Sequence, residues 1–336
     1  MASNSLQWVH ILRAFATFAV IVLHCTIASG NTFDIESRSW LTGSFINSNV
    51  RFCVPVFLML SGVLLLGKNY TLKEFLQKRM SRIILPFLFW STIYFFMIFP
   101  IRGTFTQIGF DYFKAMKGGT CYHLWYVYMI IGVYLFLPII NKWIQRASKN
   151  EILFYLIIWF AVLMIDLPGI NRLFTRIDWR YFSGFLGYLV LGYYLHKNIT
   201  VTKNRWVYAL IFVIGNLLTF VLTYITSKES GELNKTFVSY LTPNVILSSL
   251  GIFLFFKDLV FKENIFIKII NIISQYSYGI YLSHVFAMMI LPKIGIAITT
   301  NFTFINIFAT ALLSLALALI ITFVLNKLPL GKHISG

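Results

Sequence analysis

Residues 8–28 read WVHILRAFATFAVIVLHCTIA. This stretch contains no acidic residue and no lysine, and Arg13 is its only arginine. A helix of about 20 apolar residues is long enough to cross the hydrocarbon core of a bilayer, and this stretch has that length. Working outward from it, we find nine further apolar stretches, at about 52–66, 83–101, 122–140, 152–167, 181–195, 206–225, 240–256, 272–291 and 302–325. The sequence therefore predicts an all-α fold, a polytopic transmembrane bundle of about ten helices.

The composition of the whole chain agrees with a membrane protein. Of its 336 residues, 58% are apolar and only 12% are charged, whereas soluble domains average about half apolar and a quarter charged. Cys25, Cys53 and Cys121 are widely spaced and form neither a metal-binding motif nor a disulfide framework. The cysteine spacing therefore leads us to expect no bound metal. We also expect one integral-membrane domain over residues 1–336, because the connections between the apolar stretches are too short to fold alone.

The net charge of +17 is concentrated in short clusters between the apolar stretches. This arrangement indicates contact with anionic membrane lipids and a defined topology, and it does not favour a nucleic-acid partner. Of the Lys and Arg residues, 16 fall on one set of connections, including the tail after the last stretch, and 11 fall on the other. The positive-inside rule then predicts a multi-pass protein of the cell (cytoplasmic) membrane with both termini in the cytoplasm.

The first stretch also has a second interpretation. Arg13, the apolar run 14–23 and the small-residue site at 26–28 imitate a secretory signal peptide. The residues before Arg13, which include the polar Gln7 and His10, are a poor basic region for such a signal. We therefore expect a retained first helix.

Two ionisable residues, Arg13 and His24, lie in this first helix, and such residues are costly inside a membrane. They are 11 positions apart, so they differ by only about 20° around the helix and by about 16 Å along it. Arg13 could be an interfacial arginine, and His24 could be a hydrogen-bonded histidine inside the bundle. Imidazole has a pKa near neutrality, which makes His24 the best candidate for a general base.

A basic cluster, KRMSR at residues 78–82, precedes the third apolar stretch. Clusters of this kind often serve only to fix topology. Arg79 and Arg82 are also spaced to share a helical face, and guanidinium groups match phosphate oxygens well. The alternative interpretation is an anion clamp.

Five motifs occur in order along the chain: Arg13 with His24, VPVFLMLSG at 54–62, RMSRIILP at 79–86, HLWYVY at 123–128 and YSYGIYLSH at 276–284. With these motifs the chain resembles the acyltransferase 3 family of integral-membrane acyltransferases, and most closely its polysaccharide O-acetyltransferase subgroup. The resemblance covers about residues 13–284. It implies transfer of an acetyl group from acetyl-CoA to an extracytoplasmic glycan, which could be lipid-linked or part of the cell surface.

The resemblance also implies roles for individual residues. Arg13 and His24 match the family's essential pair, and Arg79 and Arg82 match its second arginine motif. Ser61 falls in a matching motif and becomes a candidate donor contact. The alternative for Ser61 and its neighbour Gly62 is a small-residue contact between helices.

His123, Trp125, Tyr281 and His284 fall in the later motifs and are candidate substrate-binding residues. Trp125 and its neighbours could instead belong to the aromatic belt at a membrane interface. Tyr281 and His284 could either form a structural hydrogen-bonded pair or line a reaction tunnel.

The implied mechanism places acetyl-CoA on the cytoplasmic side, where Arg79, Arg82 and Arg13 hold its phosphates. Its extended pantetheine arm is comparable in length with the separation of about 16 Å between Arg13 and His24. His24 then takes the proton of a glycan hydroxyl. An acyl-enzyme on Cys25 is disfavoured, because neighbouring helix positions point about 100° apart.

Two other function classes compete with this interpretation. A transporter or exporter of a polysaccharide or its precursor would also place Arg and His inside the membrane. In a transporter we would expect inverted sequence repeats, or helices broken by Gly and Pro at corresponding positions of the two halves of the chain. Neither feature is visible in the sequence. A non-catalytic assembly partner would not need Arg13 and His24.

Overall fold

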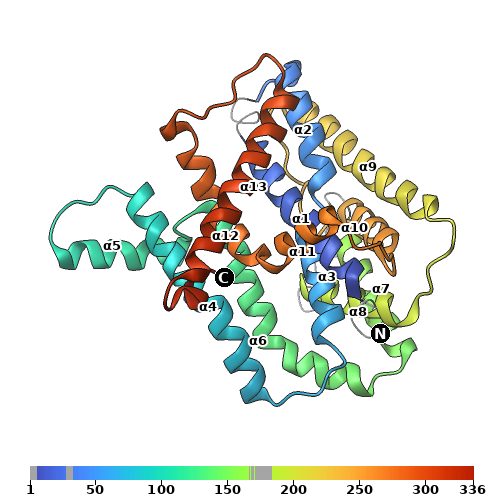
Figure 1. The fold of residues 1–336 in the computed structure, drawn as a ribbon. Helices are drawn as coiled ribbons and strands as arrows, with labels where there is room; N and C mark the ends of the chain where they lie inside the picture. Colours follow the sequence, from blue (N-terminus) through green and yellow to red (C-terminus); the bar gives the residue numbers. More distant parts are fainter. Residues whose placement is uncertain (1–5, 28–32, 166, 168–169, 171–183) are drawn as a thin grey trace. The chain divides into compact units, whose positions relative to one another are not determined.

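The computed structural model describes residues 6–27, 33–165, 167, 170 and 184–336. Every regular element in these residues is a helix. The helices are labelled in Figure 1, and their bounds are α1 Gln7–Cys25, α2 Arg38–Val50, α3 Cys53–Leu65, α4 Leu72–Ile98, α5 Phe105–Gly118, η3 Tyr122–Leu124, α6 Trp125–Arg146, α7 Lys149–Ile165, α8 Leu186–Asn198, α9 Trp206–Ser230, α10 Pro243–Phe256, α11 Ile265–Gln275, α12 Ser277–Ile290, η5 Pro292–Ile294, α13 Thr303–Lys327 and α14 Gly331–Ile334.

Within the described residues, 6 helices are long and apolar enough to cross a membrane. They are α1, the continuous pair α2 and α3, α4, η3 with α6, α9 and α13. This confirms the predicted all-helical, polytopic membrane protein. The number of ten spans and the cytoplasmic position of both termini stay predictions.

Helix α4 begins at Leu72, well before the apolar stretch predicted to start at residue 83. The start is fixed by a capping box, in which Thr71 Oγ1 accepts from the Glu74 N–H at 3.2 Å. In return, Glu74 Oε2 accepts from the Thr71 N–H at 3.1 Å. Arg79 and Arg82 therefore lie inside a helix rather than before one.

Helix α5 occupies a segment that the apolar scan leaves as a loop. It also begins with a capping box, between Thr104 and Gln107, and none of its residues is buried. Phe105, Phe110 and Phe113 are all exposed. A short amphipathic helix has no continuous apolar run, so a search for spans of about 20 residues does not find it.

The chain divides into two compact units, described separately here. The first unit consists of Met1–Lys68, Ile140–Gln275 and Ile298–Ala311, and the second consists of Asn69–Ile139, Tyr276–Ala297 and Leu312–Gly336. Helices α6 and α13 each continue from one unit into the other.

In the first unit, α1 packs against α2, α3, α10 and α11, and α3 packs closely on α8. Two glycines permit this close approach of α3 and α8. A Cβ atom on Gly62 would lie 2.0 Å from the Leu189 carbonyl oxygen, and one on Gly192 would lie 2.2 Å from the Met59 carbonyl oxygen. Gly62 is therefore a contact residue between helices, as small residues commonly are in membrane proteins.

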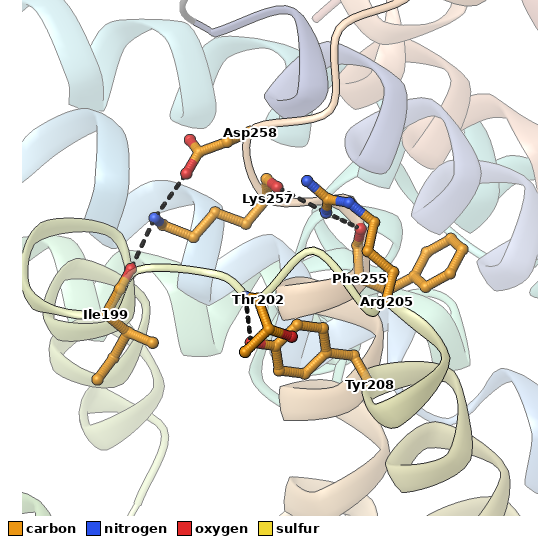
Figure 2. Close-up of polar contacts among 7 residues, drawn as sticks. All are labelled: Ile199, Thr202, Arg205, Tyr208, Phe255, Lys257 and Asp258. Carbon is orange, nitrogen blue, oxygen red and sulfur yellow. Dashed lines mark hydrogen bonds and ion pairs between the residues drawn. The ribbon is translucent and has the colours of Figure 1, made fainter.

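A polar clamp, shown in Figure 2, joins the ends of three helices of the first unit. The Lys257 side chain is only 6% exposed, and its Nζ donates to the Ile199 carbonyl at 2.9 Å and to Asp258 Oδ2 at 2.8 Å. Arg205 Nη1 donates to the carbonyls of Phe255 at 2.6 Å and Lys257 at 2.9 Å. These bonds satisfy carbonyls that helix ends leave without partners, and they tie α8, α9 and α10 together.

In the second unit, α4 packs against α5, α12 and α14. The Tyr278 hydroxyl donates to the Ile83 carbonyl at 2.9 Å, and the Tyr94 hydroxyl donates to the Leu282 carbonyl at 2.7 Å. These two hydrogen bonds connect α4 with α12, which lies about 190 residues later in the chain.

Candidate functional site

Arg13 and His24 both lie on α1, which is helical without interruption from Gln7 to Cys25. The separation of about 16 Å and the shared face that the sequence predicts therefore apply to the structure. His24 is buried and stands in the last turn, whereas Arg13 is half-buried. The helix thus presents a guanidinium and an imidazole toward its two ends along one face.

A polar network fixes the His24 end of α1. Thr26 Oγ1 donates to the Leu23 carbonyl at 2.7 Å and accepts from Asn47 Nδ2 at 2.7 Å. Asn47 Oδ1 in turn accepts from Arg51 Nε at 2.8 Å. The sequence gives no sign of this role for Asn47 and Arg51, because α2 and the residue after it lie in a segment too polar to be recognised as part of a membrane span.

Arg51 also lies over an aromatic ring, with its Cζ 5.5 Å from the centroid of Tyr240. A cation at this distance from a ring is attracted by its π-electrons. The guanidinium is therefore held between Asn47 and Tyr240.

Ser61 lies on α3, one of the helices that pack on α1. Its Oγ donates to the Phe57 carbonyl at 2.9 Å, a bond within its own helix. Its neighbour Gly62 faces α8. Contact of Ser61 with a donor stays a prediction.

Arg79 and Arg82 lie in the early turns of α4, so they share a helical face as expected from their spacing. Arg79 is half-exposed and Arg82 is exposed. The Arg79 guanidinium also acts on Tyr70, where burial raises the phenol pKa to about 12 and the guanidinium opposes that rise. Both arginines are therefore placed where an anion from solvent could reach them.

The second unit brings His123, Tyr281 and His284 together from distant parts of the sequence. The ring centroids of His123 lie 5.6 Å from Tyr281 and 5.1 Å from His284. The Tyr281 hydroxyl donates to the His123 carbonyl. All three side chains are buried, so three of the four predicted substrate-binding residues form one packed group, which we call the His123 group.

One hydrogen bond sets the tautomer of His284. Its Nδ1 lies 2.6 Å from the Tyr281 carbonyl oxygen. A carbonyl can only accept, so Nδ1 carries the hydrogen, and a neutral His284 ring has its lone pair on Nε2. This bond joins residues three positions apart on α12, and the choice between a structural pair and a tunnel lining stays open.

Tyr94 and Cys121 complete the His123 group, and the sequence analysis missed both. The Tyr94 ring lies 5.1 Å from that of His123, and its hydroxyl accepts from the Phe286 N–H at 3.0 Å. Cys121 Sγ lies 3.2 Å from His123 Nδ1. In the sequence, Tyr94 cannot be distinguished from the other aromatic residues of its apolar stretch. Cys121 belongs to no cysteine motif that would indicate a functional site.

Trp125 is 38% exposed, at the start of α6. Its ring lies 6.4 Å from that of Tyr126, which lies 5.2 Å from the ring of Tyr281. This position agrees with an interfacial aromatic residue and leaves a role in substrate binding as a prediction. In the part of the chain that the structure describes, no three His, Cys, Asp or Glu side chains converge as metal ligands would.

Comparison with known proteins identifies the family. The model of the acyltransferase 3 family, described as an acyltransferase domain, matches residues 6–327. YfiQ of Bacillus subtilis (strain 168), named as an inferred membrane-bound acyltransferase, is 23% identical over 302 residues, which are 84% of this chain and 81% of YfiQ. No solved structure matches the chain. Because the family model covers nearly the whole chain, including α1 and the His123 group, the chain belongs to the acyltransferase 3 family of integral-membrane acyltransferases.

Proposed function

We propose that this membrane acyltransferase belongs to the polysaccharide O-acetyltransferase subgroup. It moves an acetyl group from cytoplasmic acetyl-CoA to a hydroxyl of an extracytoplasmic glycan, lipid-linked or on the cell surface, and it acts in the cell membrane without a metal. The observation that supports this proposal most is the unbroken α1 helix, which carries Arg13 and His24 on one face about 16 Å apart.

His24 is the general base of the proposed reaction. Its imidazole takes the proton from the acceptor hydroxyl while that oxygen attacks the carbonyl carbon of the thioester. The tetrahedral intermediate then collapses, the carbon–sulfur bond breaks, and the leaving coenzyme A thiolate takes up the proton that His24 accepted, which returns His24 to its neutral form. The products are the acetyl ester and free coenzyme A, so atoms and charges balance.

Guanidinium groups hold the donor in this proposal. Arg79 and Arg82 share an exposed face of α4 and bind phosphate oxygens through charge-assisted hydrogen bonds. Arg13 and Ser61 are the other proposed donor contacts. His123, Trp125, Tyr281 and His284 are proposed to bind the acceptor.

A polysaccharide transporter is the second function class that the sequence leaves open. The family match argues against it, because the matched family and the relative YfiQ are both described as acyltransferases. A transporter would also give no release of coenzyme A. The two classes therefore separate in one assay.

The test uses the purified full-length protein in lipid nanodiscs, with acetyl-CoA and extracted cell-envelope glycans. The wild type should release the free thiol of coenzyme A faster when acceptor is present. His24→Ala should lower turnover by about 10² to 10⁴-fold, the usual effect of removing a general base, with little change in acetyl-CoA affinity.

His10→Ala is the matched control, because His10 is an exposed histidine on the same helix. Its Nδ1 lies 3.2 Å from Ser274 Oγ, at the opposite end of α1 from His24. This variant should keep near-wild-type turnover. A correctly inserted His24→Ala protein that transfers acetyl groups at the wild-type rate would overturn the assignment.

A further inference from the structure

The second unit contains a cavity of about 670 Å³ that the proposed reaction does not yet use. Its size is within the range of small-molecule sites in proteins. The lining residues come from the end of α4, from the segment that leads into η3 together with the first residue of η3, and from α12, and they are Ile98, Gly119, Thr120, Cys121, Tyr122, Val285, Met288 and Met289.

The wall of this cavity is mostly apolar. Val285 and Met288 lie four and seven positions after Tyr281 on α12, so the three residues share one face of that helix. The cavity therefore lies beside the His123 group along α12, and Cys121 both lines it and contacts His123. Methionine side chains adapt to flexible apolar ligands, and Met288 and Met289 provide two of them.

One buried polar group interrupts the apolar wall. Thr120 is only 2% exposed, and its Oγ1 has no hydrogen-bond partner within the described ranges. A buried hydroxyl without a partner is energetically unfavourable. Thr120 lines the cavity, and a ligand oxygen that came within reach of its hydroxyl would supply the missing partner, because a hydroxyl can donate as well as accept.

The position of the cavity along α4 separates it from the proposed phosphate clamp. Ile98 is the last residue of α4, and Arg82 lies 16 residues earlier, so the two are about 24 Å apart along the helix. That distance is most of the thickness of the hydrocarbon core. The cavity therefore lies toward the end of α4 that is far from Arg82, where the donor phosphates are proposed to bind.

From these observations we propose that the cavity binds the hydrocarbon segment of a lipid-linked acyl acceptor, with Thr120 Oγ1 hydrogen-bonded to an oxygen of its head group. The assignment of the occupant as acceptor rests on the proposed function. A finished polysaccharide has no hydrocarbon segment, and its hydroxyls would lose hydrogen bonds to water against Val285 and Met288. The walls thus favour a lipid-linked sugar over a water-soluble glycan.

Cys121 is a natural reporter of occupancy, because it lines the cavity and is otherwise buried. In a Cys25→Ala, Cys53→Ala protein it is the only thiol. Methyl methanethiosulfonate should modify it through the open cavity in nanodiscs. Burial raises the pKa of the Cys121 thiol to about 11, so the rate should rise about tenfold per pH unit below that value.

The probes are octyl glucoside below its micelle concentration and methyl glucoside, which has the same head without the chain. At ten times its dissociation constant, octyl glucoside should slow modification of Cys121 by about tenfold, because the thiol reacts only when the cavity is empty. Methyl glucoside at the same concentration should leave the rate unchanged.

Two tryptophan variants test the location. Met288→Trp should fill the cavity, so that octyl glucoside no longer changes the rate of Cys121 modification. Leu135→Trp, at an exposed position of α6, should leave the protection by octyl glucoside unchanged. A Leu135→Cys reporter in a background with Cys25, Cys53 and Cys121 changed to alanine shows whether octyl glucoside acts only through the bilayer. Its rate should not change.

The outcomes separate the two proposals, because this assay contains neither acetyl-CoA nor transfer. Equal protection by both glucosides, or none by either, overturns the hydrocarbon site even if the protein transfers acetyl groups. Protection that also appears at the Leu135→Cys reporter overturns it as well. Protection confined to Cys121 in a protein without acetyltransferase activity supports the site and contradicts the proposed function.

Discussion

The Tyr281 side chain shows how a single hydroxyl organises the His123 group. It donates to the His123 backbone carbonyl, and the Tyr281 carbonyl accepts from His284 Nδ1. One residue thus fixes both histidines, one through its side chain and one through its backbone. Removing the hydroxyl leaves a buried carbonyl without this donor.

We expect Tyr281→Phe to lower the free energy of unfolding by about 0.5–1.5 kcal/mol, the usual net contribution of one hydrogen bond, because the His123 carbonyl still accepts from the Trp125 N–H. Tyr128→Phe is the control, because its hydroxyl bonds to the Met116 carbonyl in an exposed setting. Thermal unfolding in detergent compares the two. Unchanged stability together with a loss of transfer would instead show that Tyr281 acts on substrate.

The two arginines of α4 can be tested separately from the chemistry. Arg79→Ala and Arg82→Ala should each weaken acetyl-CoA binding by about 1–3 kcal/mol, the scale of charge-assisted hydrogen bonds. Lysine at either position should restore only part, because it lacks the planar fork. Lys73→Ala, an exposed change of the same charge on the same helix, is the control.

Calorimetry on the inserted protein measures this affinity directly. If the Arg79→Ala, Arg82→Ala double variant binds acetyl-CoA as tightly as the wild type, the cluster only anchors the topology. Lys73→Ala should leave the affinity for acetyl-CoA unchanged, which would show that the loss of one positive charge on α4 is not by itself enough to weaken binding.

At the scale of helices, apolar length alone predicts the bodies of α1, α9 and α13 closely, because each is one long run of apolar residues. It misplaces the start of α4, which polar capping residues determine. It misses α2 and α5, whose polar positions break the runs. Side-chain partners such as Tyr94 with Leu282 depend on packing between distant segments, which one sequence does not reveal.

The contact of α3 with α8 gives the prediction at this scale. Gly62→Ala should destabilise the protein by about 1–3 kcal/mol, since the added methyl would overlap the Leu189 carbonyl and force the helices apart. Gly132→Ala on α6 is the control, because nothing lies within 4 Å of the added atom. That change should be neutral or stabilise by up to about 1 kcal/mol.

Unfolding temperatures of the two variants provide the comparison. Equal stability of Gly62→Ala and Gly132→Ala would contradict the close packing of α3 on α8.

At the scale of the whole molecule, the arrangement of charge carries the most information that the sequence alone provides. The excess of Lys and Arg on one set of connections gives an orientation, and the helices between those connections give the number of crossings. The segment that contains α6 is decisive for both. It separates α5, predicted outside, from the start of α7, predicted in the cytoplasm.

Lys114 and Lys149 flank this segment, and both are exposed. In a protein with Cys25, Cys53 and Cys121 changed to alanine, an impermeant maleimide applied to intact cells should label Lys114→Cys. It should label Lys149→Cys only after the membrane is permeabilised. The candidate span Tyr122–Arg146 lies between the two positions, so we expect them on opposite sides of the membrane. The reverse labelling pattern would invert the orientation and place the Arg79 and Arg82 cluster outside the cell, away from cytoplasmic acetyl-CoA. Labelling of both positions in intact cells would show that α6 does not cross the membrane.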